Sequence, residues 1–253
     1  PPRLARPVGL YDPKGLTAAL FDRLRVPYER CDGARLPQRD AILVIGREAL
    51  DGKPLPWLAD LPQGRRTLVF EQNAAALEGQ LGFRIAERGE RRLFTRFAHP
   101  VTQAFDEACF RDWGGEATLL APHLPGLPDP ETHDPHWTWC GFRNTRVWRC
   151  GNRGNVASVL IEKPAKGDWR VLLDGGFDLQ YAALLEHVAA SGRVIFCQAD
   201  VTGRRGVEPM ADRLVVNLLA YLDRARSERP RRIVCAGGGE VTDLLAAIGA
   251  GDV

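Results

Sequence analysis

The stretch Trp169-Arg170-Val171-Leu172-Leu173-Asp174-Gly175-Gly176 decides the fold that the sequence predicts. Its apolar run is short and continuous, as in a buried strand, and the glycines that follow favour a turn. The spacing further on predicts a helix over residues 179–190 and then a strand over residues 193–196. Two strands joined through a helix imply parallel pairing by a right-handed crossover. The stretch therefore predicts an α/β unit.

The helix with the clearest pattern is expected over residues 209–222. Pro209 stands in its first turn, where the missing N–H costs nothing. The predicted apolar face consists of Ala211, Leu214, Val215, Leu218, Leu219 and Leu222. This helix would cover one face of the sheet.

Short apolar strands and amphipathic helices alternate through much of the rest of the chain. Strands are predicted over residues 7–11, 41–45 and 66–70, and helices over residues 16–24 and 73–81. Residues 85–97 are expected to form a hairpin pivoting on Gly89, and residues 137–163 an antiparallel hairpin insertion. The predicted fold class is α/β: a mostly parallel, open sheet with helices on both faces.

Two units are expected. Residues 1–225 form the α/β domain. Residues 226–253 form an extra β-α unit, with a strand over residues 231–235 and a helix that carries Val241, Leu244, Leu245 and Ile248 on one face. This unit is either an edge strand of the same sheet or the start of a following domain. The chain begins Pro1-Pro2 without a Met, which favours a piece of a longer protein.

Composition excludes several classes of function. The 253 residues carry a net charge of only +2, so neither nucleic acid nor an anionic membrane is expected as a partner. No apolar run approaches the roughly 20 residues of a membrane helix. The six cysteines form no C-x-x-C pair, and a bridge between Cys140 and Cys150 is left open, as is the compartment.

The expected place for a nucleophile is the corner after the strand over residues 66–70. The chain offers Glu71-Gln72-Asn73 there, with no Cys or Ser, so nucleophilic catalysis is not expected. A dyad of Cys197 and His187 is disfavoured, because the histidine would lie in the preceding helix. His133 and His136 suit a solvated loop better than a metal site, and Gly237-Gly238-Gly239 suits a plain turn better than a phosphate loop. No metal or cofactor is expected.

Polar side chains at the carboxyl ends of the strands are the candidates for ligand binding. They are Glu71, Gln72, Asp174, Gln198, Asp200 and Arg204. Paired carboxylates are also what glycoside hydrolysis uses, although capping and loop hydrogen bonds are the commoner role of such residues.

Several segments of the sequence resemble a known family. The sequence resembles a region of large bacterial proteins related to family-two glycoside hydrolases, which are β-galactosidase-like. The segments that carry the resemblance are residues 69–72, 81–84, 99–100, 113–120, 148–158, 162–164, 176–181 and 196–204.

The resemblance implies a class I glutamine amidotransferase-like, flavodoxin-type domain carried beside a hydrolase barrel. Amidotransferases of this fold use a Cys at the corner, where this chain has Glu71-Gln72, and a His and Glu near a later strand, where it has Gln198 and Asp200. No catalytic residue is therefore carried over. The first hypothesis is a non-catalytic accessory domain that contacts a neighbouring hydrolase domain or itself. The alternative is a module that binds a sugar or small molecule at the strand ends, and an intact hydrolase ranks third.

Overall fold

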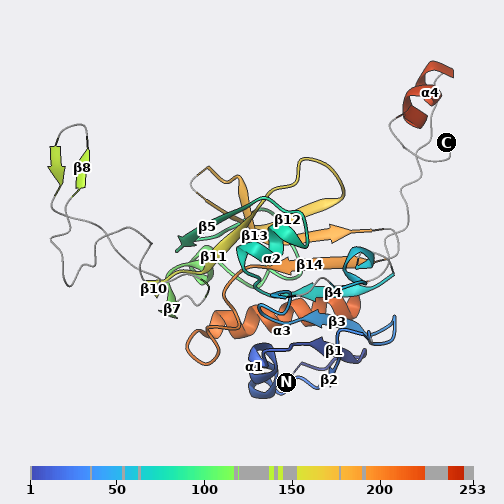
Figure 1. Cartoon of the computed structure of the whole chain (residues 1–253), viewed down its shortest axis with the longest axis horizontal. Coiled ribbons are helices and arrows are strands. Elements are labelled where there is room, and N and C mark those ends of the chain that lie inside the picture. The colour runs from blue at the N-terminus through green and yellow to red at the C-terminus, as the bar shows by residue number, and fades with distance from the viewer. Residues whose placement is uncertain are drawn as a thin grey trace.

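The computed structural model describes residues 2–34, 36–52, 55–61, 64–116, 119, 137–139, 142–144, 153–176, 178–189, 192–225 and 239–247. These residues form one ten-stranded sheet, two small two-stranded sheets and several helices (Figure 1). Within the described ranges, no helix is both long enough and apolar enough to span a membrane.

One half of the large sheet is parallel. Its strands lie in the order β2-β1-β3-β4-β14, and each neighbouring pair runs in the same direction. These strands are β1 (Val8–Tyr11), β2 (Glu29–Arg30), β3 (Ile42–Ile45), β4 (Arg66–Val69) and β14 (Arg193–Cys197). Every residue of β3 is buried, as expected for a parallel strand covered on both faces. The strands expected in these places are confirmed.

The other half of the sheet is antiparallel. It continues in the order β14-β13-β11-β5, while β12 pairs with β13 and with β6. The strands are β5 (Ile85–Glu90), β6 (Phe94–Thr95), β11 (Ala157–Glu162), β12 (Trp169–Gly175) and β13 (Tyr181–Val188). The predicted hairpin over residues 85–97 is wrong, because β5 pairs with β11 and β6 with β12 rather than with each other.

The predicted helix over residues 179–190 is also wrong, since these residues supply strand β13. β13 pairs antiparallel with both β12 and β14, so the strands of the stretch Trp169–Cys197 form a meander and not a crossover. Ala182, Leu184 and Leu185 are good helix formers, yet they are fully buried between neighbouring strands. Tertiary packing thus overrides local helix propensity.

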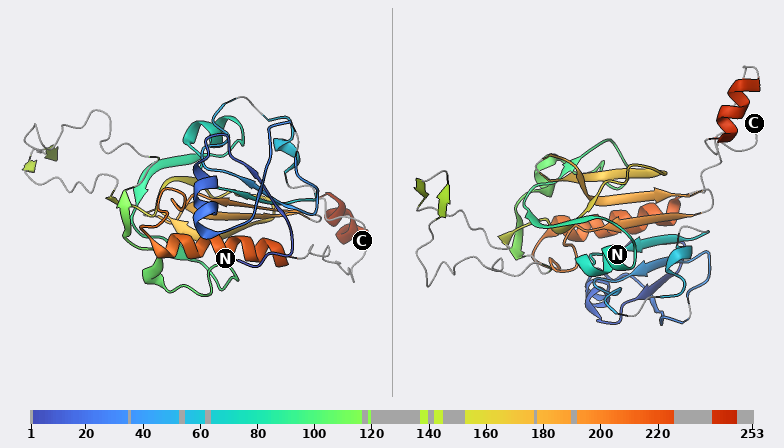
Figure 2. Two further views of the ribbon diagram at one scale, coloured as in Figure 1. Left: turned by 90° about the horizontal axis from the view of Figure 1, so that it is seen from below. Right: turned by 45° about the horizontal axis from the view of Figure 1, so that its top comes forward.

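Helices cover both faces of the sheet (Figure 2). α1 (Leu16–Leu24) and α3 (Pro209–Arg224) pack on one face, in a core with β1 and with one side of β3 and β4. α2 (Ala74–Gly79) and the short 3₁₀ helix η1 (Leu58–Asp60) pack on the opposite face. The expected apolar face of α3 is fully buried, and Pro209 lies in its first turn.

Smaller elements complete the described chain. They are η2 (Glu107–Phe110), the antiparallel pair β7 (Trp113–Glu116) and β10 (Arg153–Gly154), the hairpin β8 (Trp137–Trp139) and β9 (Phe142–Asn144), and α4 (Gly239–Ala247). The α4 helix agrees with the helix expected in the tail. The expected strand over residues 231–235, the possible Cys140–Cys150 bridge, His133, His136 and Gly237-Gly238 lie outside the described residues.

The molecule therefore belongs to the α/β class, with a parallel open half-sheet, helices on both faces and an antiparallel β8–β9 hairpin. The strand pairing expected within residues 137–163 differs, because β8 pairs with β9, whereas β11 pairs with β5 and β13. The antiparallel part is larger than the sequence predicted, because the meander β12-β13-β14 replaces a β-α-β crossover.

Candidate functional site

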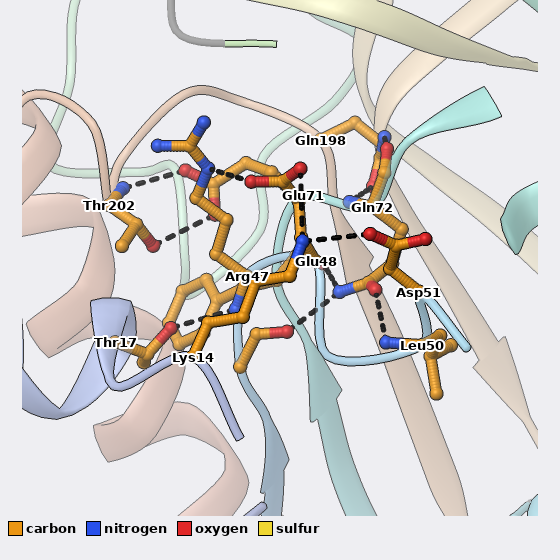
Figure 3. A network of polar contacts seen from close by, with 12 residues as sticks. Lys14, Thr17, Arg47, Glu48, Leu50, Asp51, Glu71, Gln72, Gln198 and Thr202 are labelled. Atoms are coloured by element: carbon orange, nitrogen blue, oxygen red, sulfur yellow. Dashed lines mark hydrogen bonds and ion pairs between the residues drawn. The ribbon is translucent and has the colours of Figure 1, made fainter. Parts of the chain in front are cut away.

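The carboxyl ends of β4 and β14 lie side by side because the two strands are parallel, with Val69 opposite Phe196. Glu71 and Gln72 follow the first strand, and Gln198 and Asp200 follow the second. Figure 3 shows that side chains from both loops meet there with residues that follow β3. The expectation that the strand ends gather polar groups is met for this part of the sheet.

Glu71 occupies the corner after β4, and its side chain is completely buried. One carboxylate oxygen accepts a hydrogen bond from the backbone N–H of Thr202 at 2.6 Å, and the other contacts the Thr202 hydroxyl at 2.9 Å. Burial, reinforced by the charge of Asp200 and opposed by that of Arg47, raises the pKa of Glu71 to about 8. The carboxyl is thus held in place by Thr202, and burial favours its protonated form.

Gln72 and Gln198 use their amide groups to tie loops together. The Gln72 side chain donates to the carbonyls of Gly46 and Phe70, both at 2.7 Å, and accepts from the N–H of Leu50 at 3.0 Å. The Gln198 side chain contacts the backbone of Gln72, accepting from its N–H and donating to its carbonyl, both at 3.0 Å. It also donates to the carbonyl of Val159 at 3.2 Å.

Arg204 is among the largest fully buried side chains. Its guanidinium lies 3.2 Å from the Asp200 carboxylate and donates to the carbonyls of Gly114, at 3.0 Å, and Asn155, at 2.5 Å. A buried guanidinium needs such partners, because an uncompensated buried charge is strongly destabilising. Arg204 therefore joins the β14 loop to β7 and to the chain before β11.

Asp174 does not belong to this group. It lies near the end of β12, which β13 separates from β14, and it forms ion pairs with Lys163 at 2.5 Å and Arg96 at 3.2 Å. Of the six residues proposed from the sequence, the structure brings five together and places Asp174 in a separate ion-pair group.

Two members of the strand-end group were missed from the sequence. Arg47 is 7% exposed, and its backbone N–H donates to the Thr17 hydroxyl at 2.8 Å. The charge of its guanidinium favours the ionised form of Glu71. Thr202 holds Glu71. Arg47 follows β3, so the rule that identified Glu71 could have identified it. Towards the surface, the side chain of Lys14 contacts Glu48 and Asp51 (Figure 3).

A second buried polar group lies on the antiparallel half of the sheet. Glu186 on β13 is fully buried, pairs with Arg193 at 2.7 Å and accepts a hydrogen bond from the Tyr221 hydroxyl at 2.8 Å. Burial, together with the charges of Arg193 and Arg170, lowers the pKa of the neighbouring His99 to about 4. No sequence pattern indicates this group, because Glu186 was expected on a helix.

The Cys197 thiol at the end of β14 is not placed to react. It is fully buried, and burial raises its pKa well above the ordinary value. Cys197 lies opposite Leu184, whereas His187 lies opposite Val194, three positions further along. At about 3.3 Å per residue, the thiol and the imidazole are too far apart to act as a dyad. Among the described residues, no group of three His, Cys, Asp or Glu side chains is placed to hold a metal ion.

Comparisons with known proteins give similar structures but no sequence relatives. No family model matches the chain, and no curated protein matches it. Similar solved structures include a protein from Thermoplasma acidophilum described as a GMP synthase subunit, with 10% identity, a TM-score of 0.45 and coverage of 87% of this chain and 94% of that one. A cytoplasmic protein from Salmonella typhimurium has 14% identity, a TM-score of 0.44 and coverage of 80% and 85%.

A third similar structure is an exo-β-1,4-mannosidase from an Opitutaceae bacterium, with 14% identity and a TM-score of 0.40. The likeness covers 88% of this chain but only 37% of the mannosidase. The fold and the site define an α/β protein whose strand-end corner carries a buried glutamate in contact with Thr202.

Proposed function

We propose that this chain is a non-catalytic accessory domain of a carbohydrate-active enzyme of the glycoside hydrolase kind, acting in assembly or in shaping a substrate cleft. The observation that carries the proposal is the corner after β4. There both carboxylate oxygens of Glu71 contact Thr202 and the side chain is fully buried. A catalytic carboxylate or nucleophile has to reach its substrate.

The segments that resemble the hydrolase-associated region support the same proposal. Four of these segments, which are far apart in the sequence, each contribute described residues that meet. The contacts are Glu71–Thr202, Gln72–Gln198, and those of Arg204 with Gly114 and Asn155. These polar residues hold loops together, so folding accounts for them without any reaction.

Two measurements test the proposal. The isolated chain is expected to release no ammonia from L-glutamine and to cleave no 4-nitrophenyl glycoside. In sedimentation velocity, the chain is expected to self-associate or to bind the hydrolase barrel encoded in the same reading frame. A strictly monomeric chain with no affinity for that barrel, or a reading frame that encodes no barrel, contradicts the proposal, as does turnover by the chain alone.

A second candidate function is a binding module for a sugar or another small polar molecule at the strand ends. The raised pKa of Glu71 favours it, because strongly shifted groups gather at functional sites. Titration calorimetry with a panel of mono- and oligosaccharides tests it. This candidate requires that the wild type gives heat of binding and that Asp200→Asn abolishes it. The Asp174→Asn variant, changed outside the group, is required to bind as the wild type does. Absence of heat in the wild type eliminates it.

A further inference from the structure

A cavity of about 280 Å³ lies on the α2 face of the sheet, away from the Glu71 corner. It is lined by Leu58, Ala59, Leu61, Gln80, Leu81, Phe83, Trp169, His187, Val194 and Phe196. Val194 lies opposite Thr67, near the amino end of β4, whereas Glu71 follows the carboxyl end of the same strand. The cavity is therefore separate from the strand-end group.

The rings that line the cavity hold one another in position. Phe83 meets Trp169 edge to face, with ring centroids 5.6 Å apart, and meets Phe196 in the same way at 5.0 Å. The His187 ring lies against Trp169 at 4.6 Å. None of the lining side chains is an acid, a lysine or an arginine. Apolar and aromatic walls with few polar groups are typical of small-molecule sites.

Two buried polar atoms on lining residues have no hydrogen-bond partner in the described part of the chain, namely Gln80 Oε1 and His187 Nδ1. The amide nitrogen of Gln80 donates to the carbonyls of Leu50 and of Gly52, so the orientation of the amide is fixed and its oxygen remains an acceptor. Leaving such an atom unpaired is unfavourable, so an unpaired buried group in a native fold requires an explanation.

The imidazole is neutral at physiological pH, because burial lowers the pKa of His187 despite the opposing charge of Asp168. A neutral ring presents either a lone pair or an N–H at Nδ1. A partner molecule therefore needs one donor for Gln80 and can offer either kind of group to His187.

We propose that this cavity binds an uncharged, planar compound of one or two rings that carries an N–H or O–H donor, and that the donor pairs with Gln80 Oε1. The aromatic walls suit a flat ring, and the absence of ionic lining suits a neutral one. A monosaccharide fits less well, since its several hydroxyls would need more partners than these two atoms provide. This proposal stands independently of the accessory role.

Titration calorimetry on the full chain tests it with indole as the probe. Indene has the same shape but lacks the N–H, so we expect it to bind about threefold to tenfold more weakly, the value of one hydrogen bond. D-glucose is expected to give no heat.

Two variants locate the site. Ala59 is an exposed residue on the rim of the cavity, so Ala59→Trp is expected to block the mouth and abolish indole binding without disturbing the core. Ala75, on α2, is also exposed but does not line the cavity, and Ala75→Trp is expected to bind indole as the wild type does. Circular dichroism checks the fold of both.

The proposal is overturned if indole gives no saturable heat, if indene binds as tightly as indole, if Ala59→Trp leaves binding unchanged, or if glucose binds at this site in place of the planar rings.

Discussion

Glu71 and Thr202 are joined by two contacts of 2.6 and 2.9 Å, although they are 131 positions apart in the sequence. The contacts fasten the loop after β14 over the end of β4. In this fold class, ligands usually gather at these strand ends. In this protein the corner residue instead contributes to the connection between two loops.

The Glu71–Thr202 pair predicts a specific pH dependence of stability. Burial raises the pKa of Glu71 from 4.5 to about 8, so the folded state binds a proton that the unfolded state releases. The contribution of this group is fully present below about pH 4.5 and is lost as the pH rises towards about 8. Glu71→Gln mimics the protonated acid, so we expect its stability to exceed that of the wild type by a margin that grows over this window.

Urea unfolding of both proteins at a series of pH values measures the effect. The difference between the two free energies of unfolding isolates Glu71 from the other titrating groups. Thr202→Val serves as a companion variant, since it removes only the hydroxyl contact and is expected to destabilise by about 1 kcal/mol. Parallel pH profiles for the wild type and Glu71→Gln would show that this carboxyl does not titrate abnormally.

The sequence predicts correctly those elements whose apolar residues follow a clear strand or helix pattern within the element itself. Residues 41–45 form one apolar run, and residues 209–222 repeat at helical spacing; both became the expected elements. Residues 181–188 have no such clarity, because their alanines and leucines suit a helix as well as a buried strand. These residues form a strand because β12 and β14 pair with them, and no local sequence pattern shows that pairing.

The candidate site was predictable to the same extent. Parallel strands place their carboxyl ends together, which was enough to group Glu71 with Gln198. Asp174 separates from that group because β13 intervenes as a strand. The partners of Arg204 are backbone carbonyls 90 and 49 positions away, and a sequence gives no means of pairing a guanidinium with a carbonyl at such a distance.

The two glutamines give a prediction about additivity. The Gln198 side chain bonds the backbone of Gln72, whereas the Gln72 side chain bonds Gly46, Phe70 and Leu50. Each of Gln72→Ala and Gln198→Ala leaves buried backbone groups unpaired and is expected to cost about 2–4 kcal/mol. Because the Gln198 side chain bonds the backbone of Gln72 itself, the two residues are in direct contact, and the double variant is expected to lose less stability than the sum, with a coupling of about 0.5–3 kcal/mol.

Denaturant unfolding of the four proteins in this cycle gives the coupling energy. Losses that add within about 0.3 kcal/mol would mean that the two amides act independently, in spite of the bonds from Gln198 to the Gln72 backbone.

Thiol labelling should distinguish by burial the three cysteines in the described part of the chain. Cys197 is fully buried, whereas Cys31 and Cys109 are only partly buried. Burial raises the pKa of all three thiols, and that of Cys197 well above the ordinary value. In the native protein at mildly alkaline pH, iodoacetamide is expected to modify Cys31 and Cys109 and to spare Cys197. Labelling of Cys197 should require unfolding of the core. Peptide mass spectrometry reads all three sites, and denatured protein is the control. Labelling of native Cys197 at the rate of Cys31 would indicate an accessible thiol at the strand ends.

The Asp200–Arg204 pair supplies the strongest test of the proposal that this cluster is structural. Arg204→Met removes both carbonyl contacts and leaves the buried Asp200 carboxylate without the guanidinium, so we expect a loss of about 3–5 kcal/mol. Arg205 is the adjacent, exposed arginine, and Arg205→Met is expected to change stability by less than about 0.5 kcal/mol.

The double variant Asp200→Asn with Arg204→Met separates two causes of that loss. If the loss of the guanidinium charge beside Asp200 dominates, neutralising Asp200 recovers part of the stability that Arg204→Met removes. If the lost contacts to Gly114 and Asn155 dominate, the double variant is no more stable than the single one, because those carbonyls stay unpaired in both. Thermal unfolding of the four proteins decides between these causes. An Arg204→Met protein as stable as the wild type would mean that the buried guanidinium is not required for folding, which would leave a functional role as its explanation.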